Sequence, residues 1–209
     1  MNAFLTGTDT GVGKTYVTAR LIRRLRAQGL DTVGFKPICC GSREDAELLR
    51  AAAGYALELN EVNPVWLRTP AAPYTAAMIE NRPIDLALIR ETFHALRAKH
   101  DSVLVEGVGG WLVPIERAYS VADLAGECAL PVIIVVKNRL GALNHAALTV
   151  DSIRARGLTC AGLILNDGSP AAEDSGEPQG IATATNRAVL EDVLGLPILF
   201  TLTCGQESL

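Results

Sequence analysis

The sequence predicts an α/β fold in a single domain, with a mostly parallel central sheet and helices on both faces. Short apolar runs rich in Val, Ile and Leu alternate with longer amphipathic stretches, which is the pattern of strand, helix, strand units. The runs are continuous rather than alternating, as expected of strands that are covered on both faces. The chain has 209 residues and no internal repeat, so we expect one domain over residues 1–209.

Five apolar runs predict the strands of this sheet, and a sixth run lies near the end of the chain. They cover residues 3–6, 32–36, 102–106, 131–137 and 159–166, with the sixth at 197–201. Runs of this length, rich in β-branched residues, are typical of buried strands.

Three apolar stripes at helical spacing lie between these strands. They consist of Val17, Leu21, Ile22 and Leu25; of Leu86, Ile89, Phe93 and Leu96; and of Leu143, Ala147, Val150 and Ile153. Gly29 and Gly157 follow the first and third stripes, where a helix commonly ends in a left-handed residue. We expect each stripe to pack against the sheet.

Two segments lack this periodicity. Residues 167–180, DGSPAAEDSGEPQG, combine Gly, Pro and Ser with four acids and are predicted to form a mobile acidic surface loop. Residues 60–83 are rich in proline and are predicted to form a loop that crosses the mouth of the sheet.

The charge balance argues against a nucleic-acid partner. Nineteen Lys and Arg stand against 23 Asp and Glu, which gives a net charge of −4 at pH 7. A protein that binds along a phosphate backbone normally carries a basic surplus. We therefore expect no nucleic-acid partner; the small-molecule substrates are implied by the resemblance described below.

The cysteines and the apolar runs predict a cytoplasmic protein that does not bind membranes. The five cysteines are an odd number and show no C-x-x-C spacing, which is typical of reduced thiols. The longest apolar run, residues 130–136, is too short to cross a bilayer, and the first residues do not resemble a secretory signal. The cysteines are Cys39, Cys40, Cys128, Cys160 and Cys204.

A glycine-rich segment directly follows the first predicted strand. Residues 7–15 read GTDTGVGKT, and a helical stripe begins at once. Backbone N–H groups of such a turn bind phosphate, Lys14 adds a positive charge for the outer phosphates, and the Thr15 hydroxyl can bind Mg²⁺. Five residues separate Gly7 from Gly13, one more than in the strict phosphate-loop pattern. The context predicts a P-loop NTPase-like fold.

Charged side chains end two further predicted strands. Glu106 ends the strand at 102–106 and Lys36 the strand at 32–36, which places both at the edge where ligands bind in parallel sheets. Glu106 stands where an Asp usually meets nucleotide-bound Mg²⁺, and Lys36 could stabilise a transferring phosphoryl group. Strand-end structural roles are the alternatives for both.

Other polar residues have weaker signals of their own. Asp45 follows Ser42 by three residues, which fits a helix-capping pair with a structural role. Asn166, followed by Asp167, could recognise adenine through its amide or could be an ordinary turn residue. His94, His100 and His145 have no partner at metal-ligand spacing, so we assign them no chemistry.

Four segments together resemble the dethiobiotin synthetase family. They are TGTDTGVGKT at 6–15, FKPICCG at 35–41, VEGVGGW at 105–111 and GALNH at 141–145, in the same order and spacing. The residues VNP at 62–64, NRPI at 81–84 and LPV at 130–132 support the likeness, which covers about residues 3–167.

The resemblance implies an ATP- and Mg²⁺-dependent ligase of biotin biosynthesis that closes a ureido ring on 7,8-diaminononanoate with CO₂. It implies that Lys14 and Lys36 hold the substrate carbamate and the γ-phosphate. It also implies that Thr15, Asp45 and Glu106 surround Mg²⁺, which gives Asp45 more than a capping role.

The remaining site residues also follow from the resemblance. Nucleotide binding is implied for Gly11, Val12, Gly13, Lys14, Thr15, Tyr16, Asp45, Glu106, Gly107, Val108, Gly109, Asn166 and Asp167, with residues 197–199 bordering the base. Thr10 and Cys40 are implied to contact the diamine, and Cys40 departs from the usual Ser. Gly141 and Asn144 are implied to hold the substrate carboxylate from the second subunit of a homodimer.

Two other functions compete with this interpretation. A P-loop ATPase switch of the chromosome-partitioning type would share the fold and act on a protein partner. Such switches usually carry a further lysine early in the phosphate loop, and residues 7–11 have none. An amidoligase-type relative would be expected to carry an appended amidotransferase domain, for which 209 residues leave no room.

Overall fold

The computed structural model describes residues 1–167 and 179–203, and its centre is a six-stranded sheet of order β10-β9-β8-β1-β5-β2. Every pairing between neighbouring strands of this sheet is parallel. The strands are β1 (Ala3–Gly7), β2 (Thr32–Phe35), β5 (Ser102–Glu106), β8 (Val132–Lys137), β9 (Cys160–Asn166) and β10 (Ile198–Leu202). All six predicted strands are thus confirmed, with ends shifted by one residue or so.

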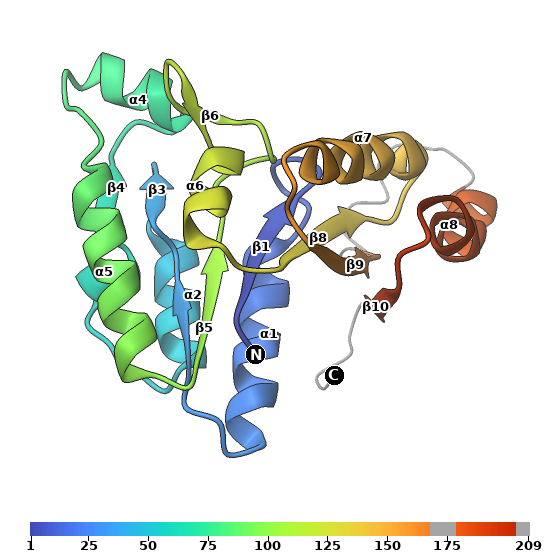
Figure 1. Ribbon diagram of the computed structural model, residues 1–209, viewed down its shortest axis with the longest axis horizontal. Helices are drawn as coiled ribbons and strands as arrows, with labels where there is room; N and C mark the ends of the chain where they lie inside the picture. The colour runs from blue at the N-terminus through green and yellow to red at the C-terminus, as the bar shows by residue number, and fades with distance from the viewer. Residues whose placement is uncertain (168–178, 204–209) are drawn as a thin grey trace.

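Helices cover both faces of the sheet, as predicted (Figure 1). The helices α1 (Lys14–Ala27) and α2 (Glu44–Ala52) share one face, because Ile22 and Leu49 both lie within 3 Å of where a Cβ on Gly34 of β2 would sit. The other face carries α5 (Leu86–Lys99), α6 (Val121–Cys128) and α7 (Ala142–Ala155), and α8 (Gln179–Leu194) packs beside α7.

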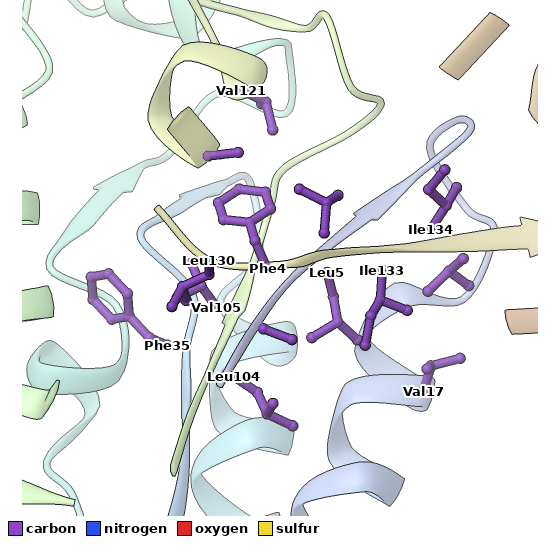
Figure 2. Close-up of a cluster of buried hydrophobic side chains, with 14 of the residues drawn as sticks. Phe4, Leu5, Val17, Phe35, Leu104, Val105, Val121, Leu130, Ile133 and Ile134 are labelled. Carbon is purple, nitrogen blue, oxygen red and sulfur yellow. The ribbon is translucent and has the colours of Figure 1, made fainter. Parts of the chain in front are cut away.

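Opposite faces of one strand supply the two halves of the core. Figure 2 shows Phe4 of β1 pointing toward Val121 of α6, whereas Leu5 points to the side of Val17 on α1. All four side chains are fully buried. The prediction from the continuous apolar runs, that these strands are buried on both faces, is therefore confirmed for β1.

Residues 60–83 are not a simple loop, so that prediction is wrong. They contain α4 (Pro73–Ile79), the strand β4 (Val65–Leu67) and most of α3 (Leu59–Val62). The strand β4 pairs in parallel with β3 (Ile38–Cys40), and α4 begins with a proline at its first position. Elements this short show no periodicity in sequence, and proline suits a helix start. A small hairpin of β6 (Pro114–Glu116) and β7 (Tyr119–Ser120) completes the fold.

The apolar stripes of the first two predicted helices are confirmed, but that of α7 is rotated. Its buried side chains include Ala146 and Thr149 beside Val150 and Ile153, whereas Leu143 is 37% exposed. Hydrophobic periodicity gives Leu more weight than Ala or Thr, although small residues allow close packing on a sheet.

The predicted acidic loop falls mostly on residues 168–178, which lie outside the described residues, as does Cys204. Its last two residues already belong to α8. Within the described ranges, no helix combines the length and apolar character needed to cross a membrane.

Candidate active site

The glycine-rich segment connects β1 to α1 as predicted. Gly13 precedes the helix with a φ of 91°, a left-handed conformation that favours glycine. No side chain caps the first turn of α1, so its N–H groups face outward at a positively polarised helix end. A Cβ on Gly13 would also lie 2.1 Å from the Asn166 amide nitrogen. This local geometry suits a phosphate group.

Lys14 lies at the start of α1 with its side chain folded back over the loop. Its Nζ donates to the Asp9 carbonyl oxygen at 3.0 Å, and the residue is only 6% exposed. Burial and the nearby positive charge of Lys36 lower the pKa of Lys14 to about 8. An anion bound beside it would reverse much of this shift.

Lys36 directly follows β2 and joins three chain segments. Its Nζ lies 2.5 Å from Glu106 Oε1, 2.9 Å from Asp45 Oδ2 and 3.3 Å from the Gly107 carbonyl oxygen. Burial alone would lower the pKa of Lys36, but the charges and hydrogen bonds of Glu106 and Asp45 outweigh it and hold the pKa above its ordinary value. Lys36 is therefore a permanent positive charge at this edge of the sheet.

The three side chains expected around a metal also converge here. The Thr15 hydroxyl donates to Glu106 Oε1 at 2.7 Å, and the Asp45 carboxylate shares Lys36 with Glu106. Burial raises the pKa of Asp45, but the charge and hydrogen bond of Lys36 prevail and lower it. We call Thr15, Lys36, Asp45 and Glu106 the carboxylate cluster. Its members come from α1, from the residue after β2, from α2 and from β5, so only the tertiary structure assembles it.

The expected capping pair of Ser42 and Asp45 is wrong. The Ser42 hydroxyl accepts from the Glu44 N–H at 3.0 Å, and Asp45 instead binds Lys36. Asp45 does lie in the first turn of α2, as expected. A buried ammonium attracts the carboxylate more strongly than a backbone N–H can.

A cavity of about 710 Å³ opens beside the carboxylate cluster. It brings together most of the predicted phosphate-loop residues, Lys36, Asp45, Val108, Gly109 and the two predicted diamine contacts, Thr10 and Cys40. Burial raises the pKa of the Cys40 thiol to about 11, so this group is a neutral, weak hydrogen-bond donor. The lining residues are Thr10, Gly11, Gly13, Lys14, Thr15, Tyr16, Lys36, Ile38, Cys39, Cys40, Ser42, Asp45, Pro70, Ala71, Ala72, Pro73, Val108, Gly109 and Val113.

Several of these lining residues were missed by sequence reasoning. Residues 70–73 form a wall of the cavity between β4 and α4, and Val113 precedes β6. Proline and alanine side chains have no functional groups that would mark a binding site in the sequence. The one signal for this wall was the proline-rich composition of residues 60–83, which showed no periodicity.

Some predicted site residues do not line this cavity, namely Val12, Glu106, Gly107, Gly141, Asn144, Asn166, Asp167 and residues 197–199. The Asn166 amide nitrogen donates to the Val12 carbonyl oxygen at 2.9 Å, so Asn166 abuts the phosphate loop. Asp167 Oδ1 accepts from the Asn138 amide at 2.8 Å, a partner that sequence reasoning missed. Gly141 and Asn144 are exposed at the start of α7.

Comparison with known proteins agrees with this geometry. A family model described as an AAA domain matches residues 2–203. Over 206 residues the chain is 45% identical to the ATP-dependent dethiobiotin synthetase BioD of Akkermansia muciniphila, covering 99% of this chain and 93% of that protein. It is 49% identical over 176 residues to the enzyme of the same name from Aromatoleum aromaticum, covering 80% and 78%.

A solved structure extends the comparison to the fold alone. The MinC:MinD cell division protein complex of Aquifex aeolicus matches with a TM-score of 0.59 at 16% identity, covering 99% of this chain and 82% of that chain. The likeness shows a shared fold and says nothing of the reaction.

Proposed function

This chain belongs to the ATP-dependent dethiobiotin synthetase family, and on that premise we propose that it converts 7,8-diaminononanoate, CO₂ and ATP to dethiobiotin, ADP and phosphate. The observation that carries the proposal is the convergence of Lys36 with two carboxylates beside a cavity of about 710 Å³ that Lys14 also lines. A site built for phosphoryl transfer needs this concentration of positioned charge.

The reaction proceeds through three bond-forming steps on the substrate. One amine of the diamine takes up CO₂ and loses a proton, which gives a carbamate. A carbamate oxygen attacks the γ-phosphorus and ADP leaves, so the carbamate becomes a mixed anhydride with phosphate. The second amine attacks the carbamate carbon, expels phosphate and closes the five-membered urea.

Lys14 and Lys36 hold and screen the negative charge of these steps. The raised pKa of Lys36 keeps it protonated, so it acts as a fixed charge rather than a base. The pKa of Lys14 is lowered to about 8, and a bound phosphate raises it again, so Lys14 is protonated when the nucleotide is bound. The phosphates rest on the loop from Gly11 to Tyr16.

The carboxylate cluster fits a magnesium ion. Glu106 Oε2 is buried and has no hydrogen-bond partner in the described part of the chain, so this oxygen lacks the ligand that burial normally requires. Thr15, Asp45 and Glu106 would hold Mg²⁺, which neutralises phosphate charge when bound. Asp45 and Glu106 supply two carboxylates, and Mg²⁺ usually keeps waters and phosphate oxygens as its other ligands.

The diamine and the nucleoside occupy opposite sides of the phosphates. Thr10 and Cys40, which line the cavity, contact the diamine, while Asn166, Asp167 and residues 197–199 border adenine. We place the reaction in the cytoplasm, in keeping with the free thiols of Cys39, Cys40, Cys128 and Cys160.

The active unit in this proposal is a homodimer. Gly141 and Asn144 of one subunit bind the substrate carboxylate of the other, at the N-terminus of a 14-residue helix. Leu140 beside them is 71% exposed, which is consistent with burial against a second copy.

The decisive experiment follows carbon and phosphate together. Purified protein receives Mg-ATP, labelled bicarbonate and the diamine, and we expect label in a cyclic urea with one ADP released per ring. ATP hydrolysis that proceeds equally well without the diamine would instead favour a partitioning-type switch.

A further inference from the structure

Lys36 lies where the chain passes from the central sheet to a second, smaller one. The strand β2 pairs with β5 as far as Phe35, and the pairing of β3 with β4 begins at Ile38. Lys36 and Pro37 lie between these strands and belong to neither ladder. Other contacts must therefore set the direction in which the Lys36 side chain leaves the backbone.

Residues 62 and 63 hold the backbone of Lys36 on both sides. The Lys36 N–H donates to the Val62 carbonyl oxygen at 2.8 Å. The Lys36 carbonyl oxygen accepts from Asn63 Nδ2, also at 2.8 Å. Because one short segment fixes both peptide planes that flank the Cα atom, the backbone of Lys36 is held in a single orientation.

The Asn63 side chain uses its whole amide in this region. It is 1% exposed, and its Nδ2 donates to the Val65 carbonyl oxygen at 2.9 Å as well as to Lys36. Its Oδ1 accepts from Arg43 Nε at 3.0 Å. A guanidinium can only donate and a carbonyl can only accept, so these partners allow one orientation of the amide. A side chain without both donors and an acceptor would leave buried polar groups unpaired.

Arg43 extends this arrangement to Asp45. It immediately precedes α2, and its Nη2 donates to the Asn63 carbonyl oxygen at 2.8 Å. Two residues farther on, Asp45 Oδ2 lies 2.9 Å from Lys36 Nζ. Asn63 thus contacts the backbone of Lys36 directly and the start of α2 through Arg43. Both partners of the Lys36–Asp45 ion pair are placed relative to one residue.

We infer that Asn63 is a positioning residue for the proposed reaction, holding the Lys36 ammonium in its place between Asp45 and Glu106. Asn63 does not line the cavity, so it acts through Lys36 and not on a substrate. A displacement of about 1 Å at a catalytic group can cost about 100-fold in rate. The inference rests on the proposed function for the reaction, and it adds a residue to which neither the motifs nor the cavity assigned a role.

Kinetics expressed per folded site test the inference. Titration with a non-hydrolysable ATP analogue counts the chains that are competent to bind, and the rate of ring closure is divided by that number. For Asn63→Ala we expect kcat per competent chain to fall about 10- to 100-fold, with the KM of each substrate and the Kd of the analogue unchanged. The matched control is Asn60→Ala, which should keep the wild-type kcat. Asn60 is exposed and accepts from the same Arg43 at 3.0 Å, without a hydrogen bond to Lys36 in the described structure.

A double-mutant cycle separates positioning from a purely structural role. In a Lys36→Ala background the ammonium is already absent, so Asn63→Ala should lower the residual rate no further. If Asn63→Ala fails to fold, Arg43→Met takes its place, because it keeps the apolar stem of a half-buried side chain and removes only the donors to Asn63. We expect Arg43→Met to lower kcat about 10-fold, again without a change in KM.

The ammonium groups of ¹⁵N-labelled lysine give a second readout that needs no turnover. The Lys36 ammonium is buried between carboxylates, and its magnetic resonance signal is assigned by its loss in Lys36→Ala. We expect this signal to shift in Asn63→Ala and to stay in place in Asn60→Ala, because only the first substitution releases the backbone of Lys36.

Three outcomes would overturn the inference. The first is a wild-type kcat per competent chain in a folded Asn63→Ala or Arg43→Met. The second is a full further loss of rate when Asn63→Ala is added to Lys36→Ala. The third is a Lys36 signal that does not move.

The two readouts also separate this inference from the proposed function. A wild-type protein that forms no cyclic urea, with a Lys36 signal that shifts in Asn63→Ala, removes the reaction and leaves the placement of Lys36 standing. A wild-type protein that forms the urea, with an Asn63→Ala variant of normal kcat, gives the reverse result.

Discussion

In the carboxylate cluster, Lys36 Nζ lies 2.5 Å from Glu106 Oε1 and 2.9 Å from Asp45 Oδ2. Arg20, in the second turn of α1, instead donates to the Tyr16 hydroxyl and lies over the Tyr16 ring, with no carboxylate partner among the described residues. Both cations are more than nine-tenths buried. The first is compensated by the protein itself, so its geometry is set before any ligand arrives. The second is compensated only in part by the described residues, so its burial costs stability. Chemistry at the first site needs charges that are fixed in this way.

The largest effect should come from removing the compensated cation. We expect Lys36→Ala to lower the rate of ring closure by about 10³-fold, at the upper end of the range measured for electrostatic groups at a transition state, while the ATP analogue still binds. Product formation and analogue titration measure the two quantities. Lys99→Ala, an exposed lysine at the end of α5, is the control. Retained ring closure in Lys36→Ala would remove Lys36 from the mechanism.

Glu106→Gln should rank next. It removes one charge that holds Lys36 in place and one proposed ligand of Mg²⁺, so we expect about a 10²-fold loss of activity and a higher Mg²⁺ requirement. Activity is titrated with Mg²⁺ at saturating ATP. Glu116→Gln, on an exposed position of β6, is the matched control. An unchanged Mg²⁺ requirement would argue against Glu106 as a metal ligand.

Lys14 should make nucleotide binding depend on pH. Its pKa is lowered to about 8 in the fold against 10.5 in the unfolded chain, so the folded protein binds fewer protons between these values. Stability from this group is therefore lowest below pH 8 and rises toward pH 10.5, by on the order of 3 kcal/mol in total. Nucleotide binding favours the protonated form, so affinity should fall as pH rises above 8.

Titration in buffers of different ionisation enthalpy checks this, because proton uptake on binding at pH 8 appears as a buffer-dependent heat. In Lys14→Met the apo protein should be more stable at pH 7 and proton uptake should disappear. Uptake that persists in the variant would place the titrating group elsewhere.

The smallest effect should follow from Cys40→Ser. The hydroxyl is a stronger donor than the neutral thiol, so we expect the KM for the diamine to fall a few-fold with the KM for ATP unchanged. Steady-state kinetics with each substrate varied in turn measures both. A change in the KM for ATP alone would indicate that Cys40 contacts the nucleotide and not the diamine.

The sequence predicted those parts of the site that consist of residues close together in the chain. Gly13, Lys14 and Thr15 are adjacent in the chain, and their place between a predicted strand and a predicted helix indicates phosphate binding. Asp45 shows the limit, because spacing from Ser42 suggested a cap, and only the approach of β2 brings Lys36 within 2.9 Å. The α7 stripe shows another limit, since periodicity ranked Leu143 above the smaller residues that pack.

The sequence by itself determined the parallel sheet, the phosphate loop and the family, because each depends on residues that are neighbours or regularly spaced. The tertiary structure alone decided which side chains compensate one another. Burial and charge pairing depend on the distances between segments. Lys36 and Glu106 are 70 residues apart in the chain, yet Lys36 Nζ lies 2.5 Å from Glu106 Oε1 in the fold. Arg20 is one of several arginines in α1. The tertiary structure buries it, with two side-chain nitrogens that have no partner among the described residues.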